Sequence, residues 1–424
     1  MKPALTFLIA ARRCEIDELE RLARTSALVG AIAELVHALQ RERGLSNVYL
    51  ASGGTRFAET RQAQVATAER CAQAVQAHFD QLEEQAGQWA DHNGTRLFSR
   101  IAWVLPGLMA LPRLRRRIAR GALDAETASA AFAKLIGGLL GVVFEAADGA
   151  SDPQISRLLA ATFQFMQGKE FAGQERACGA AAFAAGQTGE ARRQLWIDLM
   201  AAQDRCFGSF AEFAGPPLVA LWRGAQPPEA LAELERLRRI ACASAPDTVL
   251  DRELSATWFE RCSQRIDAMK AVEERLASDL RQLCARRIAD ARAEAQAHAA
   301  LLADLGTGAE ADADAFFAPA AAGPGAPADA APGFGRQMER SVLDMLQAQS
   351  QRLQAMHEEL DSVRTALNER KLVERAKGLL MAHRKLSEPE AHQLLRQTAM
   401  NQGRRLVDVA ESVLSMADYL PDNP

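Results

Sequence analysis

Residues 159–183, LAATFQFMQGKEFAGQERACGAAAF, decide the fold class of this sequence. One side of this stretch recurs in alternating steps of three and four, which is the spacing of one face of an α-helix. The residues on this face are Leu159, Thr162, Met166, Lys169, Gly173, Arg176, Ala180 and Phe183. Helical spacing continues along most of the chain, without a convincing alternating Val, Ile and Thr run. The sequence therefore predicts an all-α protein.

The composition is that of a soluble globular protein with two to three domains. The chain has 424 residues, of which 48% are hydrophobic and 25% charged, with a formal net charge of −4. No stretch approaches the ~20 apolar residues that span a bilayer. The seven cysteines lack CxxC spacing, which is typical of reduced thiols. These features predict a cytoplasmic protein that does not contact a membrane.

A change in composition divides the chain into two parts. Residues 1–302 carry helical patterns separated by short turn signals, which predicts one or two bundles of antiparallel helices. Residues 303–336 are rich in Ala, Gly, Pro and Asp, and we expect them to be a flexible linker. Residues 337–424 return to helical patterns and form a second unit.

The second unit begins with a heptad pattern. Leucines occur exactly seven residues apart, and further apolar residues fill the partner row. These residues are Leu346, Leu353, Leu360 and Leu367, with Val342, Met356 and Val363. The pattern predicts a coiled coil through which two copies form a homodimer. The alternative is one long helix that packs on its own chain.

Three predicted helices of the first unit each carry an arginine on their otherwise apolar face, which is expected to pack in the core. These arginines are Arg43, Arg176 and Arg265. An isolated buried guanidinium is costly, so each needs an anionic partner. One alternative is that nearby carboxylates pair with them, namely Glu42, Glu175 and Asp267. The other is that the arginines converge on a small planar oxyanion, which the guanidinium fork matches. The spacing leaves both alternatives open.

Three segments carry a resemblance to a known family. Leu39–Ser46, Gly168–Ala177 and Trp258–Lys270 resemble the motifs of the nitrate- and nitrite-sensing (NIT) domain. The resemblance covers most of residues 25–290 and implies two stacked four-helix bundles, with nitrate or nitrite held between arginine-bearing helices. The anion-binding residues that it implies are Arg43, Arg176, Arg265 and, off the main seam, Arg41.

The end of the chain is basic. Residues 364–416 contain ten Lys or Arg and six Asp or Glu, which indicates a polyanionic partner or, alternatively, an ordinary solvated face. Turn signals predict three short helices, the second opened by a capping box at Ser387–Glu390. Ala376–Met381, Ser387–Ala391 and Arg405–Ala410 resemble the ANTAR domain, which implies RNA binding by dimers that recognise paired hairpins.

Charge and expected exposure select the candidate RNA contacts of this ANTAR-like unit. Phosphate contacts would supply most of the affinity, and unpaired loop bases the specificity. The candidates are Lys377, Arg384, Arg396, Arg404 and Arg405.

Together these patterns predict a nitrate- or nitrite-responsive transcription antiterminator that binds hairpin RNA in the leader of a nitrate-assimilation operon. We expect indirect contact with RNA polymerase, no cofactor or metal, and nitrate or nitrite as the ligand. An enzyme is not expected, because the sequence has no Gly-rich phosphate loop and no histidine cluster. Two alternatives are an antiterminator that responds to another small anion or a protein partner, and a helical adaptor that binds no RNA.

Overall fold

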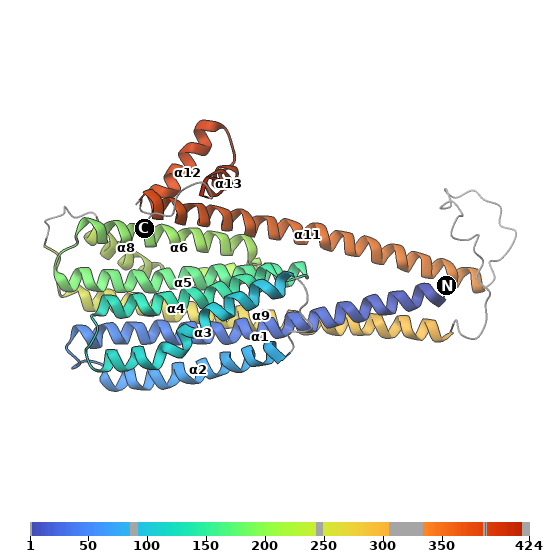
Figure 1. The fold of residues 1–424 in the computed structure, drawn as a ribbon, viewed down its shortest axis with the longest axis horizontal. Helices are drawn as coiled ribbons and strands as arrows, with labels where there is room; N and C mark the ends of the chain where they lie inside the picture. Colours follow the sequence, from blue (N-terminus) through green and yellow to red (C-terminus); the bar gives the residue numbers. More distant parts are fainter. Residues whose placement is uncertain are drawn as a thin grey trace.

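The computed structural model describes residues 2–84, 92–242, 249–304, 334–384, 386 and 388–417. Every regular element in these ranges is an α-helix, which confirms the predicted fold class (Figure 1). The helices are α1 (Lys2–Ala51), α2 (Ala58–Glu84), α3 (His92–Ala119), α4 (Ala125–Asp148), α5 (Pro153–Ala185), α6 (Glu190–Phe213), α7 (Pro216–Gly224), α8 (Pro228–Cys242), α9 (Leu254–Asp304), α11 (Phe334–Arg384), α12 (Glu388–Gln402) and α13 (Leu406–Ala417). Most of the predicted linker, 305–333, lies outside the described residues.

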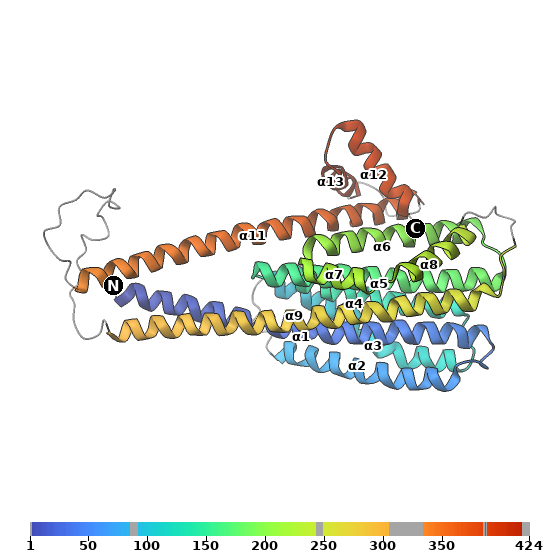
Figure 2. The ribbon, with the colours of Figure 1, turned by 180° about the vertical axis from the view of Figure 1, so that it is seen from behind.

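Two helical bundles lie side by side and form the N-terminal sensor unit. Helices α1–α4 make the first bundle, and α5, α6, α8 and α9 make the second, with the short α7 beside them (Figures 1 and 2). Helices α1 and α9 run together through the middle and extend well beyond the bundles. The faces that α1, α5 and α9 turn towards one another therefore lie at the centre of the sensor.

Helix α5 shows how local sequence sets the boundaries. Asp152 caps its first turn by accepting hydrogen bonds from the backbone N–H groups of Gln154 and Ile155, both at 3.0 Å. Pro153 follows at the first helical position, where its missing N–H costs nothing. Gly186 ends the helix with a φ of 73°, a conformation that glycine adopts without strain.

The core of the second bundle is aromatic. Trp196 and Trp258 are fully buried, and their ring centroids lie 4.8 Å apart. Both indole N–H groups have partners, because Trp196 donates to Glu175 Oε1 and Trp258 to the backbone carbonyl of Arg176, each at 3.0 Å. This core fixes the part of α5 that carries Glu175 and Arg176.

Apolar helices are more extensive than the sequence pattern predicts. Among the described residues, three segments are long and apolar enough to span a membrane by length and composition alone: Thr6–Ala51, Gly94–Ala119 and Ala125–Asp148. The expectation that no stretch approaches this length was therefore wrong. In the structure, 61% of the apolar window of α1 and 50% of that of α4 is buried inside the protein, since both helices supply core residues of the first bundle.

Helix α11 lies along the sensor and carries α12 and α13 at its C-terminal end. Leu360 and Val363 are buried, and Val363 packs against Ala160 of α5. Leu353 stays half exposed, while the side chains of Val342, Leu346 and Leu367 lie outside the described residues. The structure thus has the alternative arrangement, in which part of the heptad face packs on its own sensor. The homodimer stays a prediction.

Candidate functional site

A layer of buried polar side chains lies between α1, α5 and α9. At one end Lys169 donates from Nζ to Glu273 Oε2 at 2.6 Å, and its Nζ lies 3.0 Å from His37 Nδ1. Lys169 and Glu273 are both almost fully buried. Burial, followed by the charge of Lys169, lowers the pKa of His37 to about 3. His37 is therefore neutral at physiological pH and accepts a hydrogen bond from Lys169.

This arrangement predicts that His37 makes the fold sensitive to acid. Its pKa rises from about 3 in the folded state to the ordinary 6.5 on unfolding, so the unfolded chain binds the extra proton. Stability is then complete above pH 6.5 and is lost as the pH falls below it. Between pH 7 and 5 we expect a loss of about 1–2 kcal/mol from this residue.

Urea denaturation at the two pH values measures this loss, which His37→Gln should remove. His357→Gln is the matched control, because His357 is 73% exposed. If His37→Gln retains the full pH dependence of the wild type, the acid sensitivity originates elsewhere.

Arg43 and Glu170 form a buried ion pair in the same layer. Arg43 Nη1 donates to Glu170 Oε1 at 2.5 Å and Nη2 to Oε2 at 3.1 Å. Glu170 comes from α5 and was not among the carboxylates expected to pair with this arginine. Glu42, which was, turns instead to Arg115 of α3, with two hydrogen bonds of 2.8 Å.

Arg176 is buried next to Arg43 but has neutral partners. Nη1 donates to Ser263 Oγ at 2.9 Å and Nη2 to the backbone carbonyl of Gln40 at 3.3 Å, and the guanidinium lies over the ring of Phe259. No carboxylate of the described residues lies within ion-pair distance of it. Burial, and then the charge of Arg43, lowers the pKa of Arg176 to about 10.

Two glycines let these guanidinium groups lie directly on a neighbouring helix. A Cβ atom at Gly173 would lie 2.6 Å from Arg43 Nη2, and one at Gly44 would lie 2.6 Å from Arg176 Nη2. Both distances are shorter than any ordinary contact. The glycines in the two motifs therefore make room for the arginines.

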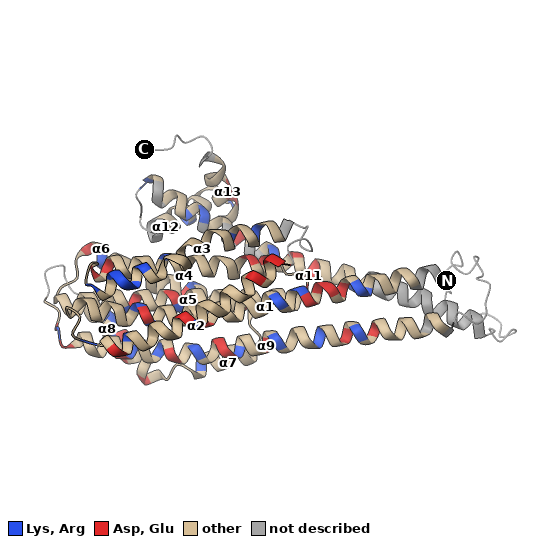
Figure 3. Cartoon of the chain, turned by 60° about the horizontal axis from the view of Figure 1, so that its bottom comes forward, with Lys and Arg blue, Asp and Glu red and all other residues tan. Residues whose placement is uncertain are grey.

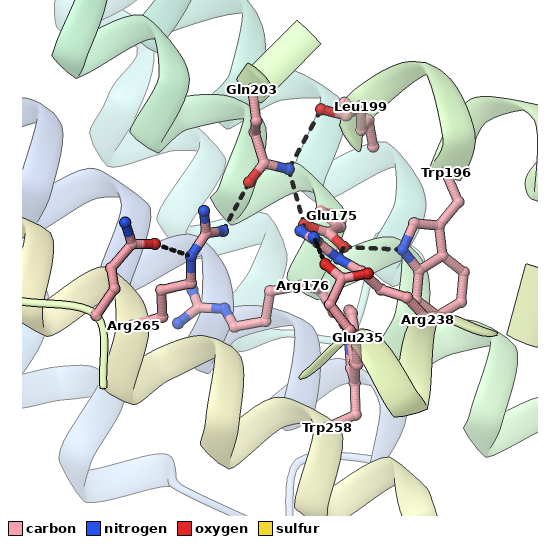
Figure 4. A network of polar contacts seen from close by, with 10 residues as sticks. Glu175, Arg176, Trp196, Leu199, Gln203, Glu235, Arg238, Trp258 and Arg265 are labelled. Carbon is pink, nitrogen blue, oxygen red and sulfur yellow. Dashed lines mark hydrogen bonds and ion pairs between the residues drawn. The ribbon is translucent and has the colours of Figure 1, made fainter. Parts of the chain in front are cut away.

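The third predicted arginine, Arg265 of α9, faces α6 and not the other two arginines. Arg265 donates to Gln203 Oε1 at 2.7 Å and to Gln226 Oε1 at 3.3 Å (Figure 4). Burial, and then the charge of Arg238, lowers its pKa. The structure thus brings Arg43 and Arg176 together and turns Arg265 towards α6. Arg41 is exposed on α1 and lies outside the buried layer.

Glu175 links Arg265 to α8 through a network that the sequence reading missed. Arg238 of α8 donates to both carboxylate oxygens of Glu175, at 2.7 and 2.6 Å (Figure 4). Gln203 donates to Glu175 at 2.7 Å while accepting from Arg265. Burial raises the pKa of Glu175, but the charge and hydrogen bonds of Arg238 outweigh it and hold the pKa below its ordinary value.

In the buried layer between α1, α5 and α9, one cation is not matched by a described carboxylate. Lys169 is balanced by Glu273 and Arg43 by Glu170. Arg176 has no such counter-charge among the described residues, so the described part of this layer carries a net charge of +1. A single buried positive charge whose hydrogen-bond partners are neutral favours a small monovalent oxyanion.

The C-terminal unit presents four of the five predicted RNA contacts to solvent. Arg384, Arg396, Arg404 and Arg405 are exposed. Lys377 is not: only 1% of it is exposed, because it lies on the face of α11 that packs against α12 and α13. Its expected surface position is therefore corrected. Charge counting cannot separate a buried lysine from a solvated one.

The exposed arginines are set among acidic side chains. Arg405 pairs with Asp408 at 3.0 Å and with Glu369 at 3.2 Å. Basic and acidic residues are also interspersed along α9 and α11 (Figure 3). Arg405 lines a cleft of about 1670 Å³ between the sensor and the C-terminal unit, together with Arg375 of α11 and Gln174 of α5. One predicted RNA contact thus faces the sensor.

The chain matches known proteins over nearly its whole length. The family described as nitrate and nitrite sensing (NIT) matches residues 34–281, and the ANTAR domain matches residues 361–414. A "nitrate regulatory protein" of Klebsiella oxytoca is 35% identical over 410 residues, which are 96% of this chain and 93% of the relative. The solved "structure of the NasR transcription antiterminator" is 32% identical, with a TM-score of 0.58, and covers 98% of this chain and 99% of its own.

Proposed function

This chain belongs to the family of nitrate-responsive transcription antiterminators that join a NIT sensor to an ANTAR domain, and we propose how its residues perform that function. Nitrate or nitrite binds between α1 and α5 at Arg43 and Arg176. In response, the ANTAR domain binds hairpin RNA in the leader of a nitrate-assimilation operon and prevents a terminator from forming. The protein acts in the cytoplasm, as a regulator and not as an enzyme.

One observation carries the anion site: Arg176 is buried beside a second buried arginine, and no carboxylate in the described part of the chain pairs with it. A monovalent anion at this point supplies the missing counter-charge. Nitrate and nitrite are planar, so each guanidinium can donate two hydrogen bonds to them. Arg265 is the third proposed contact and must turn from Gln203 and Gln226 to reach the anion. These partners are neutral amides, so this turn breaks no ion pair.

The contacts of α11 support a route from the anion to RNA. Val363 of α11 packs against Ala160 of α5, and Arg364 donates to the carbonyl of Ala150 just before that helix. An anion between α1 and α5 would shift α5 and so change how firmly α11 is held. A coupling free energy of about 1–3 kcal/mol would change RNA affinity roughly 5- to 150-fold.

The proposed RNA surface consists of Arg384, Arg396, Arg404 and Arg405. Their exposure supports the assignment, and Arg405 also lines the cleft that faces the sensor. Dimerisation through α11 belongs to the same proposal, since two copies would present two such surfaces to paired hairpins. Indirect contact with RNA polymerase would follow from binding the nascent transcript.

Binding of the full-length protein to a transcript with two adjacent leader hairpins tests this function, with and without nitrate or nitrite. We expect either anion to raise RNA affinity by at least about fivefold. Arg404→Gln/Arg405→Gln should weaken binding and reduce its dependence on salt, because fewer phosphate contacts release fewer counterions.

Calorimetric titration of each anion into the same protein is the second arm. Micromolar binding, about −8 kcal/mol, is the expected result. The nitrate response would be excluded if neither anion changed the RNA affinity and neither gave a heat of binding. Anion binding without any RNA binding would favour the adaptor alternative.

A further inference from the structure

Glu170 occupies the hydrogen-bonding position on Arg43 that an oxyanion would need. Both terminal nitrogens of the guanidinium donate to its two carboxylate oxygens, and only 1% of Arg43 and 2% of Glu170 are exposed. A guanidinium offers a carboxylate and a planar oxyanion the same pair of parallel hydrogen bonds. An anion that binds Arg43 in this way must therefore take the place of Glu170.

Two glutamines hold Glu170 in this position. Gln40 of α1 donates to Oε2 at 3.0 Å, and Gln174, one turn along α5, donates to Oε1 at 2.8 Å. Each carboxylate oxygen thus accepts two hydrogen bonds. Gln174 also lines the cleft that faces the ANTAR domain, so Glu170 connects Arg43 to that cleft.

Arg176 gives an incoming anion a first contact. It lies close enough to Arg43 for the charge of Arg43 to lower the pKa of Arg176, and its own partners are a hydroxyl and a peptide carbonyl. An anion can pair with Arg176 without displacing any charge. The exchange at Arg43 then takes place at the neighbouring guanidinium.

We propose that Glu170 is a built-in competitor: the anion binds by taking the guanidinium of Arg43 from Glu170, which turns with Gln174 towards the cleft. This inference rests on the proposed function, because it concerns the same site. Glu170 sets the anion concentration at which the sensor responds. It also selects the anion, since spherical chloride offers Arg43 a single contact and a planar oxyanion replaces both of the hydrogen bonds that Glu170 makes.

Titration of sodium nitrate and of sodium chloride into the full-length Glu170→Gln protein tests the proposal. The variant keeps the shape of the side chain but removes the competing charge. We expect its nitrate Kd to fall by at least about tenfold, and chloride to become a measurable ligand. The preference for nitrate over chloride should shrink.

Glu42→Gln is the matched control. Glu42 is fully buried on α1 next to Arg43 in sequence, but it pairs with Arg115 of α3. This variant makes the same change in net charge without releasing Arg43. Its nitrate Kd should stay within about threefold of the wild type.

Melting temperatures separate competition from a purely structural role. Glu170→Gln leaves Arg43 without a counter-charge, so nitrate should raise the melting temperature of this variant by more than that of the wild type. An equal or smaller rise contradicts the proposal.

The outcomes also separate this inference from the proposed function. If the wild type binds nitrate and the folded variant binds it no more tightly, Glu170 is not a competitor, although the proposed function stands. If neither protein binds nitrate, both ideas fail. Binding by the variant alone would establish Glu170 as the competitor and exclude nitrate as the signal for the wild type.

Discussion

An Arg176→Met variant is expected to lose nitrate affinity by at least about 100-fold while its free energy of unfolding equals or exceeds that of the wild type. Arg176 is buried, and no carboxylate among the described residues pairs with it. Burial lowers its pKa to about 10, which corresponds to a cost of a few kcal/mol for keeping this charge in the folded protein. Methionine fills a similar volume and keeps a contact with Phe259. The two lost hydrogen bonds cost about 1 kcal/mol each. Calorimetric titration and urea denaturation measure the two effects.

Arg43→Met is the matched comparison for Arg176→Met. The chemical change is the same, but Arg43 leaves behind Glu170, a buried carboxylate. Both variants should lose nitrate binding, whereas only Arg43→Met should be destabilised, by about 3–5 kcal/mol. Equal destabilisation of the two variants would show that Arg176 is as firmly paired as Arg43 and does not need an anion as its counter-charge.

Gly179→Ala is expected to destabilise the sensor by about 3 kcal/mol. A Cβ atom at Gly179 would lie 2.3 Å from Nε1 of Trp258 and 2.7 Å from Cη2 of Trp196. Neither ring can retreat, because both are fully buried and each N–H is hydrogen-bonded. The backbone of α5 must therefore shift beside Arg176, and nitrate affinity should fall as well. Thermal and urea denaturation provide the measurement.

Gly30→Ala serves as the control for this substitution. Gly30 lies within α1, and a Cβ atom there would meet nothing within 4 Å. Alanine should raise stability by up to about 1 kcal/mol, the usual difference in helix propensity. If Gly179→Ala behaved in the same way, the two indole rings would be far more mobile than their packing indicates.

Helical periodicity alone places the buried layer, but it cannot assign partners within it. Alternating steps of three and four put Lys169, Arg43 and Arg176 on inward faces, and the structure buries all three. Which carboxylate meets Arg43 depends on how α1 and α5 pack. Glu170 is 127 residues away from it along the chain, whereas Glu42, next to it in sequence, points to α3. Sequence proximity was therefore the wrong guide to the counter-charge.

The same limit explains the other departures. Arg265 lies on the expected seam of α9, but that helix packs on both α1 and α5, and its rotation turns Arg265 towards Gln203 of α6. The heptads of α11 predict a buried stripe without saying what covers it, and α5 covers part of it in the structure. Lys377 carries a charge but packs where an apolar residue would. Each case depends on contacts between distant segments, which local spacing does not encode.

The hydrogen bond from Trp258 to the carbonyl of Arg176 gives the sensor an optical consequence. The emission of a buried indole responds to the electric field along its ring. A bound anion would cancel the charge of Arg176, the residue whose carbonyl accepts the Trp258 hydrogen bond. Nitrate binding can thus be followed by intrinsic fluorescence, without a label and on the millisecond scale of a rapid-mixing instrument. Trp103 is half exposed on α3, away from this hydrogen bond, and it contributes emission that solvent quenchers can remove selectively.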